Sequence, residues 1–156
     1  MYDYFKGQLT AVSPTSATVE CGGVGYFLHI SLNTYTAIKE EKQVKLLAHL
    51  IVREDVQELY GFISEEERIL FRQLISVSGV GASTGRMILS SLPADDLRSI
   101  IASGNSGALQ KVKGIGAKTA QRIIIDLKDK VLKSGGDQVI SAISHNTVRS
   151  EALSAY

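Results

Sequence analysis

Two short glycine motifs in this chain combine residue types that could bind phosphate. Residues 77–85 read VSGVGASTG and residues 112–120 read VKGIGAKTA, and five of the nine aligned positions are identical. Glycine allows a tight turn and lets a phosphate approach the backbone closely, while free amides at the start of the following helix favour negative charge. Such contacts reach the nucleic-acid backbone and read no base. The repeat therefore predicts two helix-hairpin-helix units that bind DNA regardless of its sequence.

The two motifs differ in the side chains around their glycines. The candidate DNA-binding residues are Gly79, Val80, Gly81, Ser83 and Arg86 in the first motif and Lys113, Gly114, Ile115, Gly116, Lys118, Thr119 and Arg122 in the second. We expect Val80 and Ile115 to pack between the helices and anchor each turn. Because Ser83 occupies the place that Lys118 has in the second motif, we expect the second motif to bind phosphate more strongly. The alternative is a purely structural role, in which glycine only turns the chain between packed helices.

Charge is unevenly distributed along the chain, which has a net charge of +1. Residues 54–67 contain six acidic residues and no basic one, whereas residues 111–133 contain seven basic and two acidic residues. The first segment should repel phosphate, and the second should attract it. This segregation favours a nucleic-acid partner that the net charge alone does not reveal.

The same motifs do not fit a nucleotide-binding site. Residues 79–81 follow a predicted helix rather than a strand, and residues 116–119 lack the adjacent Gly-Lys-Thr order of a phosphate-binding P-loop. We therefore expect no ATP site and no catalytic residue. An enzyme that uses Asp126 or Asp129 on DNA is one alternative, and an RNA-binding or scaffold barrel is another. The lysines around both aspartates favour a solvated helix face instead of an active site.

The composition does not indicate metal, cofactor or membrane sites. His29, His49 and His145 are scattered without a partner at ligand spacing. The lone Cys21 lies in an apolar stretch that suggests a small buried side chain. No apolar run approaches the roughly 20 residues of a membrane-spanning helix. We expect no metal, no cofactor, and a soluble cytoplasmic protein.

Hydrophobic periodicity divides the chain into a β part and a helical part. Alternating apolar residues predict strands over residues 4–12, 18–21, 24–30, 44–52 and 56–62, with a short helix around residues 32–38. Glycines at positions 22 and 23 predict a tight hairpin turn. The predicted fold class is α+β and multidomain. An N-terminal OB-type β-barrel, residues 1–63, is followed by an all-helical domain with tandem helix-hairpin-helix motifs, residues 64–134.

Helix signals begin at Ser64. Residues 64–67 read SEEE, a capping box in which the serine should accept a hydrogen bond from the Glu67 amide and the Glu67 side chain should reach back. Pro93 should open a later helix that Gly104 closes. A long helix with an apolar stripe should follow the second glycine motif.

Several longer motifs connect these elements to a known family. Residues 52–62 read VREDVQELYGF, residues 22–26 read GGVGY, and residues 113–122 read KGIGAKTAQR. Together with the barrel and the paired glycine hairpins, they resemble the RuvA family of bacterial Holliday-junction proteins along nearly the whole chain. The resemblance implies a non-catalytic DNA-binding subunit of a branch-migration complex that acts in homologous recombination and repair.

The resemblance also implies partners and a further site. It implies a homotetramer, with a pair of tetramers as a further assembly, that binds a four-way junction in an open, square form. The implied protein partners are a RuvB-type hexameric ATPase motor and a RuvC-type resolvase. In that family two acids between the fourth and fifth strands lie at the crossover, and Glu54 and Asp55 match them. Acids there would repel phosphate and help to separate strands. Without the family, they are ordinary exposed turn residues.

The chain departs from the family pattern at two places. Ala82 and Ser83 stand where relatives commonly have proline and lysine, which weakens the expectation of a phosphate contact at the first hairpin. Residues 135–147 lose helical periodicity and predict a flexible linker. Residues 148–156 read as the start of a truncated C-terminal helical domain, so the family's motor-contacting domain is nearly absent from this sequence.

Overall fold

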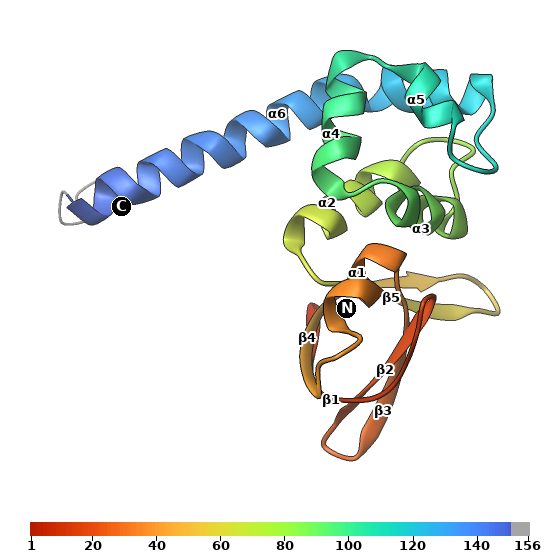
Figure 1. Cartoon of the computed structure of the whole chain (residues 1–156), viewed down its shortest axis with the longest axis vertical. Coiled ribbons are helices and arrows are strands. Elements are labelled where there is room, and N and C mark those ends of the chain that lie inside the picture. The colour runs from red at the N-terminus through yellow and green to blue at the C-terminus, as the bar shows by residue number, and fades with distance from the viewer. Residues whose placement is uncertain (151–156) are drawn as a thin grey trace.

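The N-terminal part of the chain is a closed five-stranded barrel (Figure 1). The computed structural model describes the backbone of residues 1–150 and the side chains of residues 1–133. The strands pair in the order β1-β2-β3-β5-β4, and every pair is antiparallel except β3 with β5. The barrel elements are β1 (Tyr4–Ser13), β2 (Ser16–Cys21), β3 (Val24–His29), α1 (Leu32–Ile38), β4 (Gln43–Val52) and β5 (Gln57–Phe62). The predicted OB-type barrel is confirmed.

The turns and alternation that predict the barrel have the expected geometry. Gly22 and Gly23 have φ angles of +58° and +87°, which a hairpin of this kind requires at both central positions. Along β4, Val44, Leu46 and Ala48 are buried in the barrel core, while the residues between them face outward.

The second part of the chain is helical. Its elements are α2 (Glu65–Ile75), α3 (Ala82–Ser91), α4 (Ala94–Ser103), α5 (Ser106–Gln110) and α6 (Ala117–Ser150). Ser64 caps α2 and accepts from the Glu67 amide at 3.2 Å, and Gly104 ends α4 with a left-handed φ of +72°, both as predicted. The two glycine motifs lie between α2 and α3 and between α5 and α6.

The capping box is formed only in part, because the Glu67 side chain does not reach back. Its Oε1 accepts hydrogen bonds from the hydroxyls of Ser31 at 3.0 Å and Thr34 at 2.7 Å. Glu67 is 3% exposed, and burial raises the pKa of its carboxyl, although the two hydroxyl hydrogen bonds act in the opposite direction. The predicted second half of the box is wrong because the hydroxyls of α1 and its cap compete for the carboxylate. This contact joins the barrel to α2.

Aromatic packing continues from the barrel into the helices. Tyr60 and Phe62 of β5 belong to the same apolar core as α2, α3, α4 and α6. The Phe71 ring of α2 stacks on Tyr60 with centroids 5.0 Å apart and lies 4.9 Å from the Phe62 ring. The outer face of β5 is thus a wall of the helical core.

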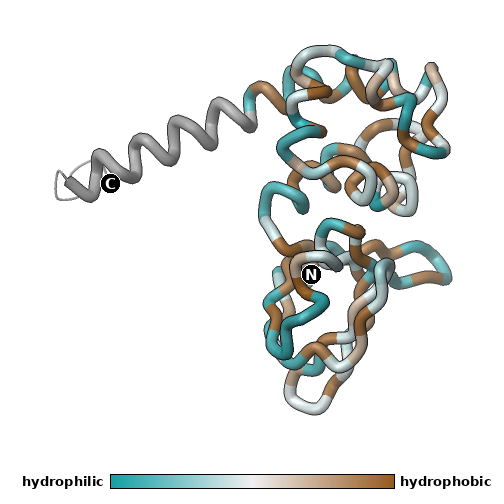
Figure 2. The backbone as a smooth tube through the Cα atoms, viewed as in Figure 1, coloured by the Kyte–Doolittle hydropathy of each residue, from teal (hydrophilic) through white to brown (hydrophobic). Residues whose placement is uncertain are grey.

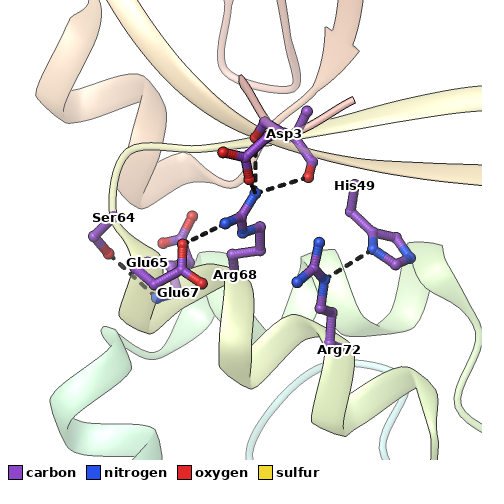
Figure 3. A network of polar contacts seen from close by, with 8 residues as sticks. Asp3, His49, Ser64, Glu65, Glu67, Arg68 and Arg72 are labelled. Atoms are coloured by element: carbon purple, nitrogen blue, oxygen red, sulfur yellow. Dashed lines mark hydrogen bonds and ion pairs between the residues drawn. The ribbon is translucent and has the colours of Figure 1, made fainter. Parts of the chain in front are cut away.

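Two arginines of α2 add polar contacts to this junction (Figure 3). Arg68 donates through Nη1 to the Asp3 carbonyl at 2.7 Å and the Ala48 carbonyl at 3.2 Å, and it pairs with the carboxylates of Asp3 and Glu65. Arg72 Nε donates to His49 Nδ1 at 3.1 Å. Burial, together with the positive charges of Arg72 and Arg68, lowers the pKa of His49, so the neutral ring that accepts this bond is favoured.

The last helix runs away from the rest of the molecule (Figure 1). Its buried stripe of Ala120, Ile123, Leu127 and Val131 packs on the helical core, as the periodicity predicts. The backbone stays helical to Ser150, which differs from the flexible linker predicted at residues 135–147. Glycine disfavours helix by about 1 kcal/mol per residue, but no proline interrupts this segment, so helical hydrogen bonding can continue. Residues 151–156 lie outside the described part, and the division into separate domains stays a prediction.

Candidate nucleic-acid interface

The two glycine motifs fold into turns with the same backbone geometry. Gly79 has a φ of +91° and Gly114 a φ of +89°, a region that side-chain-bearing residues rarely adopt. The Val80 amide donates to the Val77 carbonyl at 3.0 Å, and the Ile115 amide makes the equivalent bond to Val112 at 3.1 Å. Val80 and Ile115 are only 5% and 6% exposed. The predicted anchoring of each turn by one apolar side chain is confirmed.

Both turns are open to solvent at their second glycine. Gly81 and Gly116 precede α3 and α6, and their carbonyls accept the first bonds of those helices, from Gly85 at 2.9 Å and Ala120 at 3.0 Å. Because Gly81 has no side chain, no side chain at this position caps α3. A Cβ placed on either residue would meet no heavy atom within 4 Å. The first helical amides, which have no partner within a helix, can therefore be reached from outside.

Basic side chains surround the second turn. Lys113, Lys118 and Arg122 are exposed, and Thr119 is half-buried. Within the part of the chain whose side chains are described, none of the three bases takes part in an ion pair. Their charge is therefore available to an anion beside the open amides.

The first turn has different surroundings because its side chains lie toward the barrel. Ser83 is exposed, and its side chain lies close enough to the Tyr60 hydroxyl to lower the pKa of that group. Arg86 is half-buried, and its Nη1 donates to the Ile30 carbonyl at 3.4 Å. Arg86, the basic residue nearest this turn, is thus partly engaged in a hydrogen bond within the protein. The sequence pattern could not indicate this contact.

The acidic turn between β4 and β5 projects from the barrel. Glu54 and Asp55 are exposed at its tip, and the turn is closed by the Arg53 amide, which donates to the Val56 carbonyl at 2.8 Å. The tip is hydrophilic (Figure 2). In Figure 1 this turn and both glycine turns extend to the same side, opposite to the direction in which α6 leaves. Phosphate-attracting and phosphate-repelling groups therefore share one side of the molecule.

The sequence of this chain is similar to those of known proteins. A family model described as the RuvA N-terminal domain matches residues 1–61, and one described as a SAM-like helix-hairpin-helix tandem matches residues 71–129. A protein of Christiangramia forsetii named Holliday junction branch migration complex subunit RuvA is 52% identical over 155 residues, which cover 99% of this chain and 80% of that protein. The chain belongs to the RuvA family. Proteins with the same name from Azobacteroides pseudotrichonymphae and Flavobacterium psychrophilum are 49% and 47% identical. Each of these matches also covers 99% of this chain and 80% of the relative.

Within this RuvA-family chain, the acidic run at residues 54–67 does not form one surface. Glu58 accepts a hydrogen bond from the Tyr60 hydroxyl at 3.3 Å, and Glu65 pairs with Arg68. Glu67 is buried against α1. Glu54, Asp55 and Glu66 remain exposed, and of these only Glu54 and Asp55 lie together in the turn.

One group beside the RuvA-family turns was missed from the sequence. Burial and the neighbouring Glu58 carboxylate raise the pKa of Tyr60, which keeps its hydroxyl protonated beside Ser83. The outward register of Tyr60 on a strand was the available signal, but its contact with the first glycine turn depends on tertiary packing. Within the described residues, no cluster of three or more histidine, cysteine or acidic side chains could bind a metal ion. No helix there is both long and apolar enough to span a bilayer.

Proposed function

We propose that this protein binds four-way (Holliday) DNA junctions without regard to base sequence and keeps them open and square for branch migration. One observation carries the proposal: two solvent-open amide turns and an exposed pair of acids lie on one side of the molecule. The amide turns bind phosphates of a duplex arm, and the second, surrounded by bases, contributes more. The acids repel phosphate at the crossover and disfavour a continuous duplex there.

The site residues follow from this arrangement. The proposed phosphate contacts are made by the turns at residues 79–81 and 114–116, with Lys113, Lys118, Thr119 and Arg122 beside the second. Ser83 and Arg86 are proposed as minor contributors, since Ser83 is uncharged and lies beside Tyr60, and Arg86 donates to the Ile30 carbonyl. Glu54 and Asp55 form the acidic pin at the junction centre.

The partners are proposed from the family and the chemistry of the site. A homotetramer, alone or as a pair of tetramers, would give each junction arm an equivalent binding surface. We infer that the chain is a non-catalytic subunit, and that a RuvB-type ATPase moves the DNA and a RuvC-type resolvase cuts it. These steps belong to recombination and repair of DNA, and we propose a cytoplasmic location for the protein.

Lys118→Glu tests the phosphate contact. Because it reverses a charge beside the open amides, we expect junction affinity at fixed low salt to fall about tenfold or more, equally for junctions of different base sequence. Lys130→Glu is the matched control, since Lys130 is exposed on the same helix farther from the turn. Equal affinity of both variants and the parent in a gel-shift titration would contradict the proposal.

Glu54→Lys combined with Asp55→Lys tests the acidic pin. Removing the repulsion should leave junction binding intact and strengthen binding to plain duplex, so that selectivity falls. Competition between four-way and linear DNA of equal length measures this ratio. A double variant with unaltered selectivity would remove the acids from the proposed site.

A further inference from the structure

The outer face of the barrel carries a row of rings that ends at an exposed phenylalanine. Phe27 of β3 is 55% exposed. Its ring meets the His29 ring edge-on, with centroids 5.4 Å apart and planes at 90°. The His29 ring lies 5.1 Å from that of Tyr60, which stacks on the buried Phe71. Phe27 is therefore the solvent-facing end of a row whose other end is fixed in the helical core.

This row lies between the two parts of the proposed DNA-binding surface. β3 pairs with β5 in parallel with His29 opposite Tyr60, so Phe27 lies level with Glu58. Asp55 precedes Glu58 by three residues, which span at most about 11 Å. At the other end, the Tyr60 hydroxyl lies beside the Ser83 side chain at the start of α3. The exposed Phe27 ring is thus close to the acidic turn. The contacts of Phe27 with His29 and of His29 with Tyr60 connect it to the first glycine turn.

The position and chemistry of Phe27 suggest what it contacts. A phenyl ring offers no charge to a phosphate, but it presents a flat apolar face on which a base can stack in a sequence-tolerant way. In an open junction, the base pairs beside the crossover lose a stacking neighbour, so their faces are available. The edge-on contact with His29 restricts the rotation of the ring.

We propose that Phe27 contacts the DNA directly by stacking on a base next to the crossover of the bound junction. This inference rests on the proposed function, since it requires a junction centred on the acidic turn. The contact adds affinity for the junction that a linear duplex, whose bases stay stacked, does not gain.

The test replaces the Phe27 ring and measures the fluorescence emission of a base analogue beside the crossover. The probe is a four-way junction with 2-aminopurine at a crossover position, titrated with the parent chain, Phe27→Leu and Phe27→Tyr. We expect Phe27→Leu to bind the junction about tenfold more weakly and linear duplex unchanged, and to lose quenching of the 2-aminopurine emission. Phe27→Tyr, which keeps an aromatic ring, should retain both the junction affinity and the quenching of the parent chain. Tyr4→Leu, which removes another exposed ring from the barrel, is the matched control and should match the parent.

The outcomes separate the two proposals. If the parent binds the four-way junction no better than linear DNA, the proposed function fails, and this inference fails with it. If the parent prefers the junction but Phe27→Leu has the same affinity and emission, only the stacking role is overturned. If Phe27→Leu changes the molar mass measured by light scattering, the ring lies between copies of the chain, which also overturns the stacking role.

Discussion

Gly81 and Gly116 show how a single residue can place stability and binding in opposition. Each precedes a helix at a position where aspartate, asparagine or serine would normally cap, and each leaves that place without a side chain. Neither has the left-handed φ of Gly79 and Gly114. The backbone conformation therefore does not require glycine at either position, whereas the proposed approach of a phosphate does favour a small residue there.

Gly116→Asp is expected to fold at least as well as the parent and to bind DNA much less. The new carboxylate can cap α6, which adds a few tenths of a kcal/mol to the free energy of unfolding. The same carboxylate occupies the open amides and repels phosphate, so junction affinity should fall about tenfold or more. Urea unfolding and gel-shift titration measure the two effects. Gly107→Asp, at an exposed position of α5 seven residues before Gly114, is a control for the added charge.

Residue types predicted the glycine turns and their buried anchors, but they did not predict where the neighbouring side chains point. The two turns, their apolar anchors and the bases of the second turn follow from spacing and composition alone. Ser83 occupies the place of Lys118, and Arg86 is the nearest base of the first motif, yet Ser83 lies beside Tyr60 and Arg86 donates to the Ile30 carbonyl. Nothing local to α3 specifies that contact, because it depends on which strand packs against the helix.

Among the elements, α1 and α2 are joined by a buried carboxylate whose protonation affects stability. Burial raises the pKa of Glu67 above its ordinary value of 4.5. Between those two pKa values the folded chain binds more protons than the unfolded chain, so stability decreases as pH rises through this window. Above the folded pKa, the buried charge is a constant cost that Ser31 and Thr34 reduce by hydrogen bonding.

Glu67→Gln should therefore increase the free energy of unfolding at pH 7 and flatten its dependence on pH above 4.5. A glutamine oxygen can still accept from both hydroxyls, but it carries no charge. Glu67→Ala should instead lose about 1–3 kcal/mol, because it leaves Ser31 and Thr34 without their acceptor. Urea unfolding at several pH values distinguishes the variants. A glutamine variant less stable than the parent at pH 7 would show that the charge itself stabilises the contact.

Elements with strong periodicity were predicted from their own pattern, whereas the helix before the second glycine motif was predicted only from the repeat. The strands alternate clearly, and α2, α3 and α4 carry apolar faces, so their existence follows from pattern. The short α5 has too few residues for a period, although Asn105 caps it through the Ala108 amide at 3.2 Å. Residues 135–147 lost the apolar stripe that marks a packed helix, but a helical backbone needs no such stripe.

At the scale of the whole molecule, the barrel and the helices are expected to unfold together. Tyr60 and Phe62 contribute to the helical core, so melting either part would expose the rings of the other. The chain has no tryptophan and six tyrosines, five of them within residues 1–63. The near-ultraviolet tyrosine signal therefore reports the barrel, while ellipticity at 222 nm reports mainly the helices. The two thermal transitions should coincide.

Phe71→Ala should lower both midpoints together. Truncating this ring removes contacts with Tyr60 and Phe62 and leaves a cavity, at a cost of about 3–5 kcal/mol. Leu132→Ala is a control, since that side chain is half exposed on α6. Separate transitions, with only the helical signal shifted, would mean that the ring contacts do not couple the two parts.

The packing of Tyr60 and Phe62 into the helical core also determines whether the protein or the bound DNA must deform. Since β5 is built into the helical core, the acidic tip and the amide turns are held in a nearly constant relation, and the protein has little freedom to adapt to a mismatched ligand. The deformation that unstacks and spreads the arms therefore falls on the nucleic acid, and its cost depends on how flexible the nucleic acid is. Sequences or counterions that stiffen the branch point should then slow association and weaken affinity, even where no protein atom touches the altered bases.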